Sequence, residues 1–272
     1  LQEYARKCGF SKFLVALSGG IDSSLALTIV KLALKPGQEI EALHMPSIFS
    51  SSESYELSAK ICENLKIPLK IIPIKFFHAA IKNSFTDSIG QEIEGLADEN
   101  IQSRLRGSLL YTRSNQSGAM VLNTSNKSEI AVGYSTLYGD SVGAISILGD
   151  IYKSEVFDLC RFINKKYDQI IPEAIITREP SAELKANQKD SQSLPSYEKL
   201  DAMLEGILSY RYGLKDLHQL GFSKDELNKI YGLYTKSEYK RRQFCPIIKV
   251  RAKSFGFGYR VPICKHNFTE LK

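Results

Sequence analysis

Apolar and polar stretches alternate along the first two-thirds of the chain. Short runs of Val, Ile, Leu and Ala predict buried strands, whereas apolar residues at every third or fourth position predict amphipathic helices. The predicted strands cover residues 13–18, 40–45, 69–74, 120–123 and 143–148, and the predicted helices cover residues 23–34, 53–65, 100–113 and 153–166. Strands that alternate with helices of this length are typical of a doubly wound, mostly parallel α/β sheet.

The pattern changes after Ile176. Residues 177–195 are polar and contain Pro180 and Pro195. This segment is either a linker or a flap that orders over a substrate, since long structureless segments in compact domains are usually functional or disordered. Residues 196–272 are helical and basic and end in an irregular tail. We therefore expect one domain over residues 1–272, with an α/β core at 1–176 and a helical extension and tail at 196–272.

Composition limits the function classes. A hydrophobic fraction of 43% suits a globular core, and no apolar stretch reaches the roughly 20 residues that span a bilayer. Five scattered cysteines without a C-x-x-C pair indicate reduced thiols and a cytoplasmic location. The net charge of +6 suits a polyanionic small ligand as well as nucleic acid. Because the chain begins Leu-Gln-Glu without Met or a signal-peptide pattern, we expect a processed chain or a fragment of a longer one.

The most informative local feature is the end of the first predicted strand. This strand runs into Ser18-Gly19-Gly20, and the following helix opens with Asp22, Ser23 and Ser24. Free N–H groups at a helix N-terminus attract phosphate, and glycines let the backbone approach it closely. No lysine follows these glycines, so this is not the Walker phosphate loop. A carboxylate beside phosphate requires an intervening cation, and Asp22 therefore predicts Mg²⁺ at this loop.

A second carboxylate follows the fourth predicted strand. That strand ends in Asn123-Thr124, and Glu129 lies at the start of the next predicted helix. Taken alone, Glu129 is more often a capping residue. If the first and fourth strands are neighbours, however, Asp22 and Glu129 meet and could share one Mg²⁺ ion over the same phosphates.

These residues resemble a known family. The S-G-G-x-D-S pattern is similar to the pyrophosphate loop of the N-type ATP pyrophosphatases, which have an adenine nucleotide alpha hydrolase-like, Rossmann-like fold and adenylate an acceptor. Further segments resemble the NAD synthetases in order and spacing: residues 99–106 (ENIQSRLR), 123–129 (NTSNKSE), 150–153 (DIYK), 179–184 (EPSAEL) and 238–241 (EYKR). Ser103 departs from the alanine that is usual in the first of these segments.

The resemblance implies a ligase that amidates deamido-NAD to NAD, with ATP as co-substrate, ammonia as nitrogen donor, and AMP and pyrophosphate as products. It assigns catalysis to Asp22, Glu129, Asp140 and Lys153, and Mg²⁺ binding to Asp22 and Glu129. It assigns ATP to Ser18, Gly19, Gly20, Asp22, Ser23, Ser24, Met45, Thr124, Lys153 and Ser181, and deamido-NAD to Asn100, Arg104, Asp140, Lys240 and Arg241.

The resemblance also concerns partners. It implies a homodimer or a higher homo-oligomer, and no nucleic-acid or membrane partner. The tail from Tyr239 resembles that of glutamine-dependent synthetases, which carry a nitrilase-like glutaminase domain upstream, whereas a free-standing ammonia-dependent enzyme is the alternative. Two other function classes stay open: another adenylating enzyme, such as a GMP synthetase or a tRNA-modifying enzyme, and a non-catalytic nucleotide-binding module.

Overall fold

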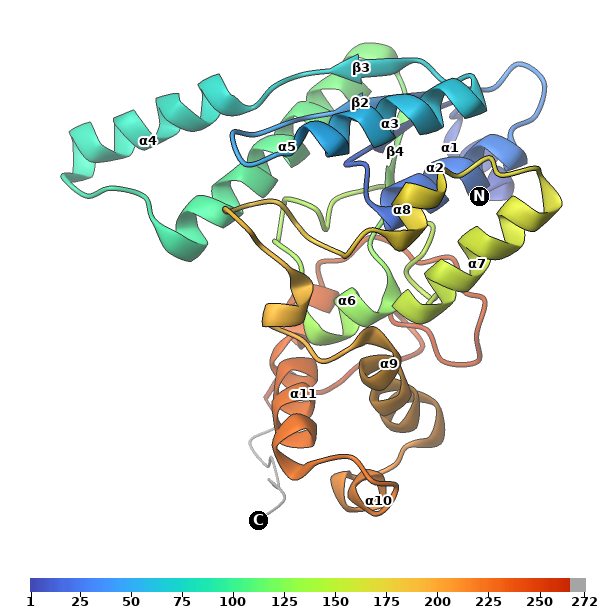
Figure 1. The fold of residues 1–272 in the computed structure, drawn as a ribbon, viewed down its shortest axis with the longest axis vertical. Helices are drawn as coiled ribbons and strands as arrows, with labels where there is room; N and C mark the ends of the chain where they lie inside the picture. Colours follow the sequence, from blue (N-terminus) through green and yellow to red (C-terminus); the bar gives the residue numbers. More distant parts are fainter. Residues whose placement is uncertain (265–272) are drawn as a thin grey trace.

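The computed structural model describes residues 1–264. Its sheet has the strand order β3-β2-β1-β4-β5, and every neighbouring pair is parallel (Figure 1). The strands are β1 (Lys12–Ala16), β2 (Glu39–His44), β3 (Leu69–Ile71), β4 (Met120–Asn123) and β5 (Ile145–Ser146). The predicted parallel α/β sheet is confirmed. From β1 the chain continues to β2 and β3 on one side, and from β4 it continues to β5 on the other side. The strand order therefore reverses between β1 and β4, and a crevice forms there at their carboxyl ends.

Helices cover both faces of the sheet. In β1, Phe13 and Val15 belong to the core beneath α2 (Ile21–Ala33), α3 (Ser52–Leu65) and α7 (Lys153–Lys166), whereas Leu14 belongs to the opposite core beneath α5 (Gly95–Ser117). This alternation follows from the two-residue period of a strand. Both faces of β1 are therefore buried, as the continuous apolar run indicated.

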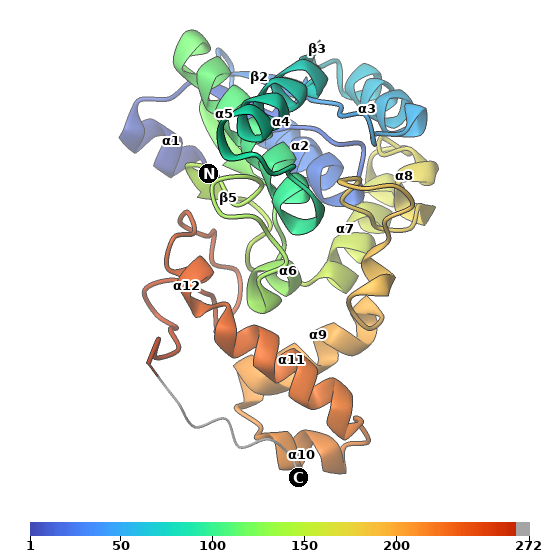
Figure 2. The same cartoon turned by 90° about the vertical axis from the view of Figure 1, so that its left-hand side faces the viewer.

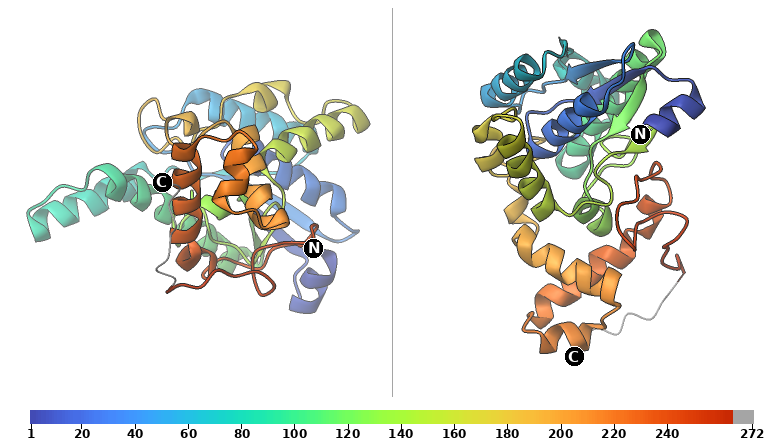
Figure 3. Two further views of the ribbon diagram at one scale, coloured as in Figure 1. Left: turned by 90° about the horizontal axis from the view of Figure 1, so that it is seen from below. Right: turned by 90° about the vertical axis from the view of Figure 1, so that its right-hand side faces the viewer.

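Three α-helices were not predicted. They are α1 (Gln2–Cys8), α4 (Lys75–Ile89) and the short α8 (Glu173–Thr177). Only His78 of α4 is buried, and the helix projects from the body (Figure 3), so apolar side chains such as Phe76 and Phe85 are exposed. The predicted strand at 69–74 also ends early, at Ile71. The Ile74 N–H donates to the Pro46 carbonyl. Pro46 has no N–H to donate in return, so the ladder of hydrogen bonds with β2 stops there.

The extension that follows residue 196 is helical, as predicted. It comprises α9 (Tyr197–Glu205), a π-helical turn (Gly206–Tyr210), α10 (Leu214–Gln219), α11 (Lys224–Lys236) and α12 (Glu238–Arg241). Helices α9–α11 and the π-helical turn form a second apolar core together with α6 (Lys127–Val132), so the extension packs directly against the element that carries Glu129 (Figure 2). The irregular tail then returns to the sheet, where Ser146 of β5 bonds to Pro246 and Ile248.

Within residues 1–264, no helix is both long enough and apolar enough to cross a membrane.

Candidate functional site

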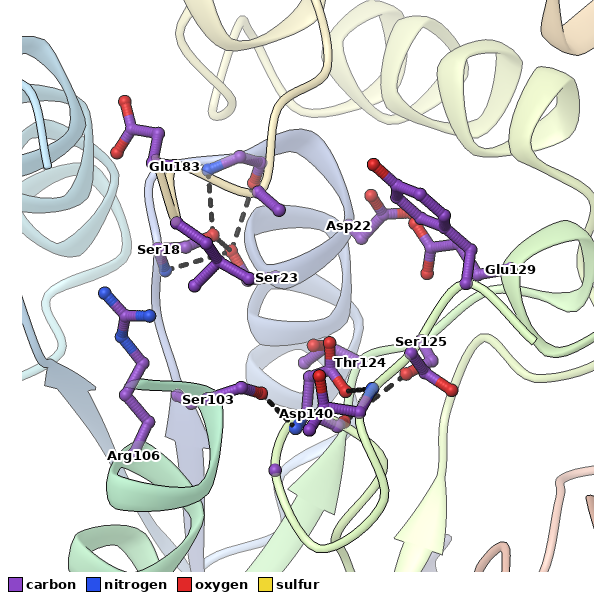
Figure 4. A pocket seen from close by; sticks show the side chains of 18 of the residues that line it. Ser18, Asp22, Ser23, Ser103, Arg106, Thr124, Ser125, Glu129, Asp140 and Glu183 are labelled. Carbon is purple, nitrogen blue, oxygen red and sulfur yellow. Dashed lines mark hydrogen bonds between the residues drawn. The ribbon is translucent and has the colours of Figure 1, made fainter. Parts of the chain in front are cut away.

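A pocket of about 560 Å³ lies at the carboxyl ends of β1, β2 and β4, at the crevice between β1 and β4 (Figure 4). It brings together thirteen of the predicted residues: Ser18, Gly20, Asp22, Ser23, Met45, Asn100, Arg104, Thr124, Glu129, Asp140, Lys153, Ser181 and Lys240. The remaining three, Gly19, Ser24 and Arg241, do not line it. The segments that follow β1, β2 and β4 thus converge with α5 and the residues after α8 on one cavity.

The loop after β1 forms one wall. The hydroxyls of Ser18 and Ser23 lie 3.1 Å apart, and the Gly20 N–H donates to Ser18 Oγ at 3.2 Å. The first turn of α2 has no side-chain cap, so its N–H groups and the positive end of the helix dipole face the pocket. Such an end of a helix favours a bound anion.

Gly19 and Ser24 support this loop from outside the cavity. Gly19 has a φ of 83°, and a Cβ built on it would lie 2.4 Å from the carbonyl oxygen of Ser54. Glycine is therefore required both for the turn and for the contact with α3. Ser24 is fully buried, and its hydroxyl has no hydrogen-bond partner among the described residues.

Asp22 and Glu129 meet over Lys153, as the adjacency of β1 and β4 predicted. Lys153 forms an ion pair with Asp22, and its Nζ lies 3.6 Å from Glu129 Oε1. Asn126 donates to Asp22 Oδ1 at 2.9 Å and forms a capping box with Glu129 at the start of α6. Glu129 is therefore both the capping residue and the partner of Asp22, so the two interpretations are compatible.

The charges of this group are strongly coupled. Burial and the nearby negative charge of Asp22 raise the pKa of Glu129 well above its usual range. Burial alone would lower the pKa of Lys153, but the two carboxylates outweigh it and raise this pKa. Lys153 is 3% exposed and remains charged between them. A divalent cation would relieve the remaining repulsion between the carboxylates.

The carboxylate pair fits a magnesium ion that substrate phosphates help to bind. Within residues 1–264, no cluster of three or more His, Cys, Asp or Glu side chains forms a metal site by itself. Mg²⁺, however, typically takes one or two carboxylates and completes its shell with water and phosphate oxygens. Asp22 and Glu129 are the residues that could bind it.

The opposite wall comes from α5 and the loop after α6. Asn100 accepts from the Thr136 hydroxyl at 2.7 Å, and Arg104 Nε donates to the Leu137 carbonyl at 3.2 Å. Asp140 accepts from the Thr136 N–H at 2.6 Å, and desolvation raises the pKa of this carboxyl to about 6. Arg106, which was not predicted, donates to the Met45 carbonyl at 2.9 Å, and burial lowers its pKa to about 10. Arg106 adds a cation to this wall.

The polar segment that follows α8 covers the pocket, which favours a flap over a plain linker. We call residues 178–194 the strap. Glu183 accepts from the hydroxyls of Ser51 and Ser54, at 2.9 and 2.7 Å, at the N-terminus of α3. Arg178 binds the same two hydroxyls and pairs with Glu183 at 2.7 Å. On the α5 side, Gln102 donates to the Leu184 carbonyl at 2.9 Å.

Lys240 and Arg241 occupy different environments. Lys240 lines the pocket and donates to the carbonyls of Gly133 and Ser135, at 2.8 and 2.6 Å, beyond the end of α6. Arg241 is buried away from the pocket. It pairs with Glu238, donates to the Ala131 carbonyl and stacks on the ring of Tyr234. Its contacts join α12 to α6 and α11, and we do not include Arg241 among the ligand-binding residues.

Comparisons with known proteins identify relatives across most of the chain. A family model described as NAD synthase matches residues 1–244. A glutamine-dependent NAD(+) synthetase of Synechocystis is 42% identical over 264 residues, which are 97% of this chain and 47% of that protein. The chain thus spans about half the length of the curated relatives that it matches.

Two solved structures share the fold. A glutamine-dependent NAD+ synthetase from Acinetobacter baumannii, in complex with ADP, has a TM-score of 0.63 and 35% identity, covering 96% of this chain and 47% of that one. An NMN synthetase from Francisella tularensis has a TM-score of 0.74 and 28% identity, covering 89% of this chain and 91% of that one.

Proposed function

Because the chain belongs to the NAD synthase family, we propose that it amidates deamido-NAD to NAD with ATP, releasing AMP and pyrophosphate. One observation carries the proposal. The convergence of Asp22, Glu129 and Lys153 at the uncapped start of α2 occurs in the same pocket as Asn100, Arg104 and Asp140. A triphosphate end and an acceptor end therefore lie within one cavity.

At the phosphate end, catalysis needs position and charge rather than a nucleophilic side chain. The nicotinate carboxylate attacks the α-phosphorus of ATP, which forms an acyl adenylate and releases pyrophosphate. The N–H groups of the 18–23 loop bind the leaving pyrophosphate, and Lys153 stabilises the charge that develops on it. Ser181, on the strap, supplies a further hydroxyl to the phosphates, while Met45 and Thr124 line the ATP site.

Asp22 and Glu129 would bind Mg²⁺, which supplies charge neutralisation on the phosphates. To bind the cation, Asp22 and Glu129 must both be ionised. Burial first, and the negative charge of Asp22 second, raise the pKa of Glu129. A bound cation would offset both effects by stabilising the ionised carboxylates.

At the acceptor end, the proposal assigns deamido-NAD to Asn100, Arg104, Asp140 and Lys240. The Arg104 guanidinium can bind a phosphate through two parallel bonds, and Asn100 offers a neutral amide. In the second step ammonia attacks the acyl carbon, AMP leaves, and the ammonia nitrogen loses a proton. The proposal also assigns Asp140 the role of orienting the incoming ammonium.

We also propose the wider context of this reaction. The matched relatives named glutamine-dependent are about twice as long as this chain, which favours ammonia from a glutaminase domain outside these residues. A homodimer is supported by the exposed apolar side chains of the projecting α4, which include Phe76, Phe85 and Ile89. The shared core of α6 and α9–α11 supports one domain over residues 1–272, and free thiols are consistent with the cytoplasm.

Pyrophosphate release from ATP tests the proposal. The chain is incubated with ATP, Mg²⁺ and ammonium, and in parallel with deamido-NAD, nicotinate mononucleotide, xanthosine monophosphate or no acceptor. We expect release with deamido-NAD, and D22N should abolish it without lowering the melting temperature. Release with nicotinate mononucleotide alone would assign the chain the activity named for the Francisella protein, and release with xanthosine monophosphate alone would indicate a GMP synthetase.

A further inference from the structure

A buried ion pair lies behind the pocket and does not line it. Lys127 is 1% exposed and Asp150 is fully buried, and Lys127 Nζ lies 2.8 Å from Asp150 Oδ1. The same ammonium lies 5.0 Å from the centre of the Tyr152 ring. Charges so deeply buried require complete hydrogen bonding, because each lost partner leaves a charge without solvation.

The C-terminal tail supplies the missing partners. Asp150 Oδ2 accepts from the backbone N–H groups of Val250 and Arg251, at 2.9 and 2.8 Å. Lys127 Nζ donates to the backbone carbonyl of Lys253. Three backbone groups of residues 250–253 therefore complete this ion pair. Val250 and its neighbour Lys249 are themselves exposed.

The same pair joins the two helix starts that position the catalytic charges. Lys127 is the first residue of α6, two positions before Glu129, and Asp150 lies three positions before Lys153, the first residue of α7. The Lys127 N–H donates to the Ile151 carbonyl at 2.8 Å, and the Lys153 N–H donates to Ser128 Oγ at 2.9 Å. The distance between Glu129 and Lys153 thus depends on how these two turns are fixed together.

We propose that Lys127, Asp150 and tail residues 250–253 are positioning residues that set the placement of Glu129 and Lys153 over Asp22. They act through the two helix starts and touch no substrate. The inference rests on the proposed function only in one respect, which is that Asp22, Glu129 and Lys153 bind nucleotide phosphates and their cation. Partners one shell removed from a metal site typically change metal affinity or activity 10–100-fold when they are lost.

The test measures binding of ATP, without acceptor, by titration calorimetry with and without Mg²⁺. The ratio of the two affinities is the magnesium enhancement. K127M removes the buried ammonium at similar volume, and K249M removes a charge from the exposed tail as its matched control. V250P removes one N–H donor to Asp150, and V250A is its control for the lost side chain.

We expect K127M to lower the magnesium enhancement at least tenfold, and V250P to lower it several-fold, while both controls keep the wild-type ratio. In turnover assays kcat should fall with little change in KM for deamido-NAD, because the acceptor wall is untouched. If K127M fails to fold, V250P decides the question. A wild-type enhancement in both folded variants would overturn the inference. A lost enhancement in a chain that never turns over deamido-NAD would leave the inference standing and reject the proposed function.

Discussion

Gly19→Ala tests whether the loop after β1 needs its close approach to α3. Gly19 has a φ of 83°, and the added Cβ would lie 2.4 Å from the Ser54 carbonyl oxygen and 3.0 Å from its Cα. Both atoms are backbone, so no side chain can rotate away. Ser54 also anchors the strap through Glu183, and a shift on either side of the contact therefore disturbs the pocket.

Two costs can be separated. The left-handed conformation costs an alanine about 1–2 kcal/mol relative to glycine. Since real Cβ contacts essentially never lie under 3.0 Å, the gap of 2.4 Å must widen by at least 0.6 Å (3.0 − 2.4). A misplacement on the order of 1 Å at a phosphate-positioning loop can lower a rate about 100-fold.

Gly37→Ala is the matched control. Gly37 has a φ of 81° and no atom within 4 Å of its built Cβ, so this variant has the backbone strain without the clash. We expect G19A and G37A both to lose stability in thermal melts, whereas only G19A loses kcat/KM, by about 100-fold. Equal losses of kcat/KM in the two variants would refute the argument that the contact with Ser54 positions the loop.

Two further predictions concern charge and the strap. Burial and Asp22 raise the pKa of Glu129 from 4.5 to about 8. The folded chain therefore binds the proton of the Glu129 carboxyl more tightly than the unfolded chain does. As the pH rises from 4.5 to about 8 this carboxyl loses its proton, and the free energy of unfolding falls. E129Q should therefore melt above the wild type at pH 8, with a difference that shrinks toward pH 4.5; a pH-independent difference would contradict the assignment. E183Q weakens the bonds to α3, worth about 1.5 kcal/mol, so trypsin should cleave the strap about tenfold faster. The control is E179Q, whose lost bonds to Lys189 and Ser191 stay within the strap, and it should be cleaved at the wild-type rate. Equal cleavage of the two variants would show that the bonds of Glu183 to Ser51 and Ser54 do not hold the strap in place.

The fold was predictable where packing follows a simple period. The apolar runs at β1, β2 and β4 and the amphipathic α3 and α7 lie within one or two residues of their predictions, because each buries a regular face. Helix α4 was missed because it contributes only His78 to the interior. The early end of β3 depends on Pro46, which lies two residues after the end of β2. The apolar pattern within residues 69–74 carries no information about this proline.

The sequence predicted the chemistry of the site better than it predicted the complete set of residues that form it. Asp22 and Glu129 could be paired from sequence only on the condition that β1 and β4 are neighbours. The strand-helix alternation left that condition open, and the structure meets it. Arg178 and Glu183 could not, since their partners Ser51 and Ser54 lie more than 120 positions away. The resemblance of residues 238–241 assigned both Lys240 and Arg241 to the ligand, but helix α12 directs the Arg241 guanidinium into the interior, against Glu238 and the ring of Tyr234.

Several departures from locally favourable structure gather around one cavity. The first turn of α2 lacks a side-chain cap. Burial and the nearby Asp22 carboxylate raise the pKa of Glu129, and Glu183 has a left-handed φ of 49°. Each lowers the stability of the chain alone. A bound polyanion with its cation would relieve the first two, and the hydroxyls of Ser51 and Ser54 hold the third in place. Such departures persist where function requires them, so their coincidence supports this pocket as the active site independently of any relative.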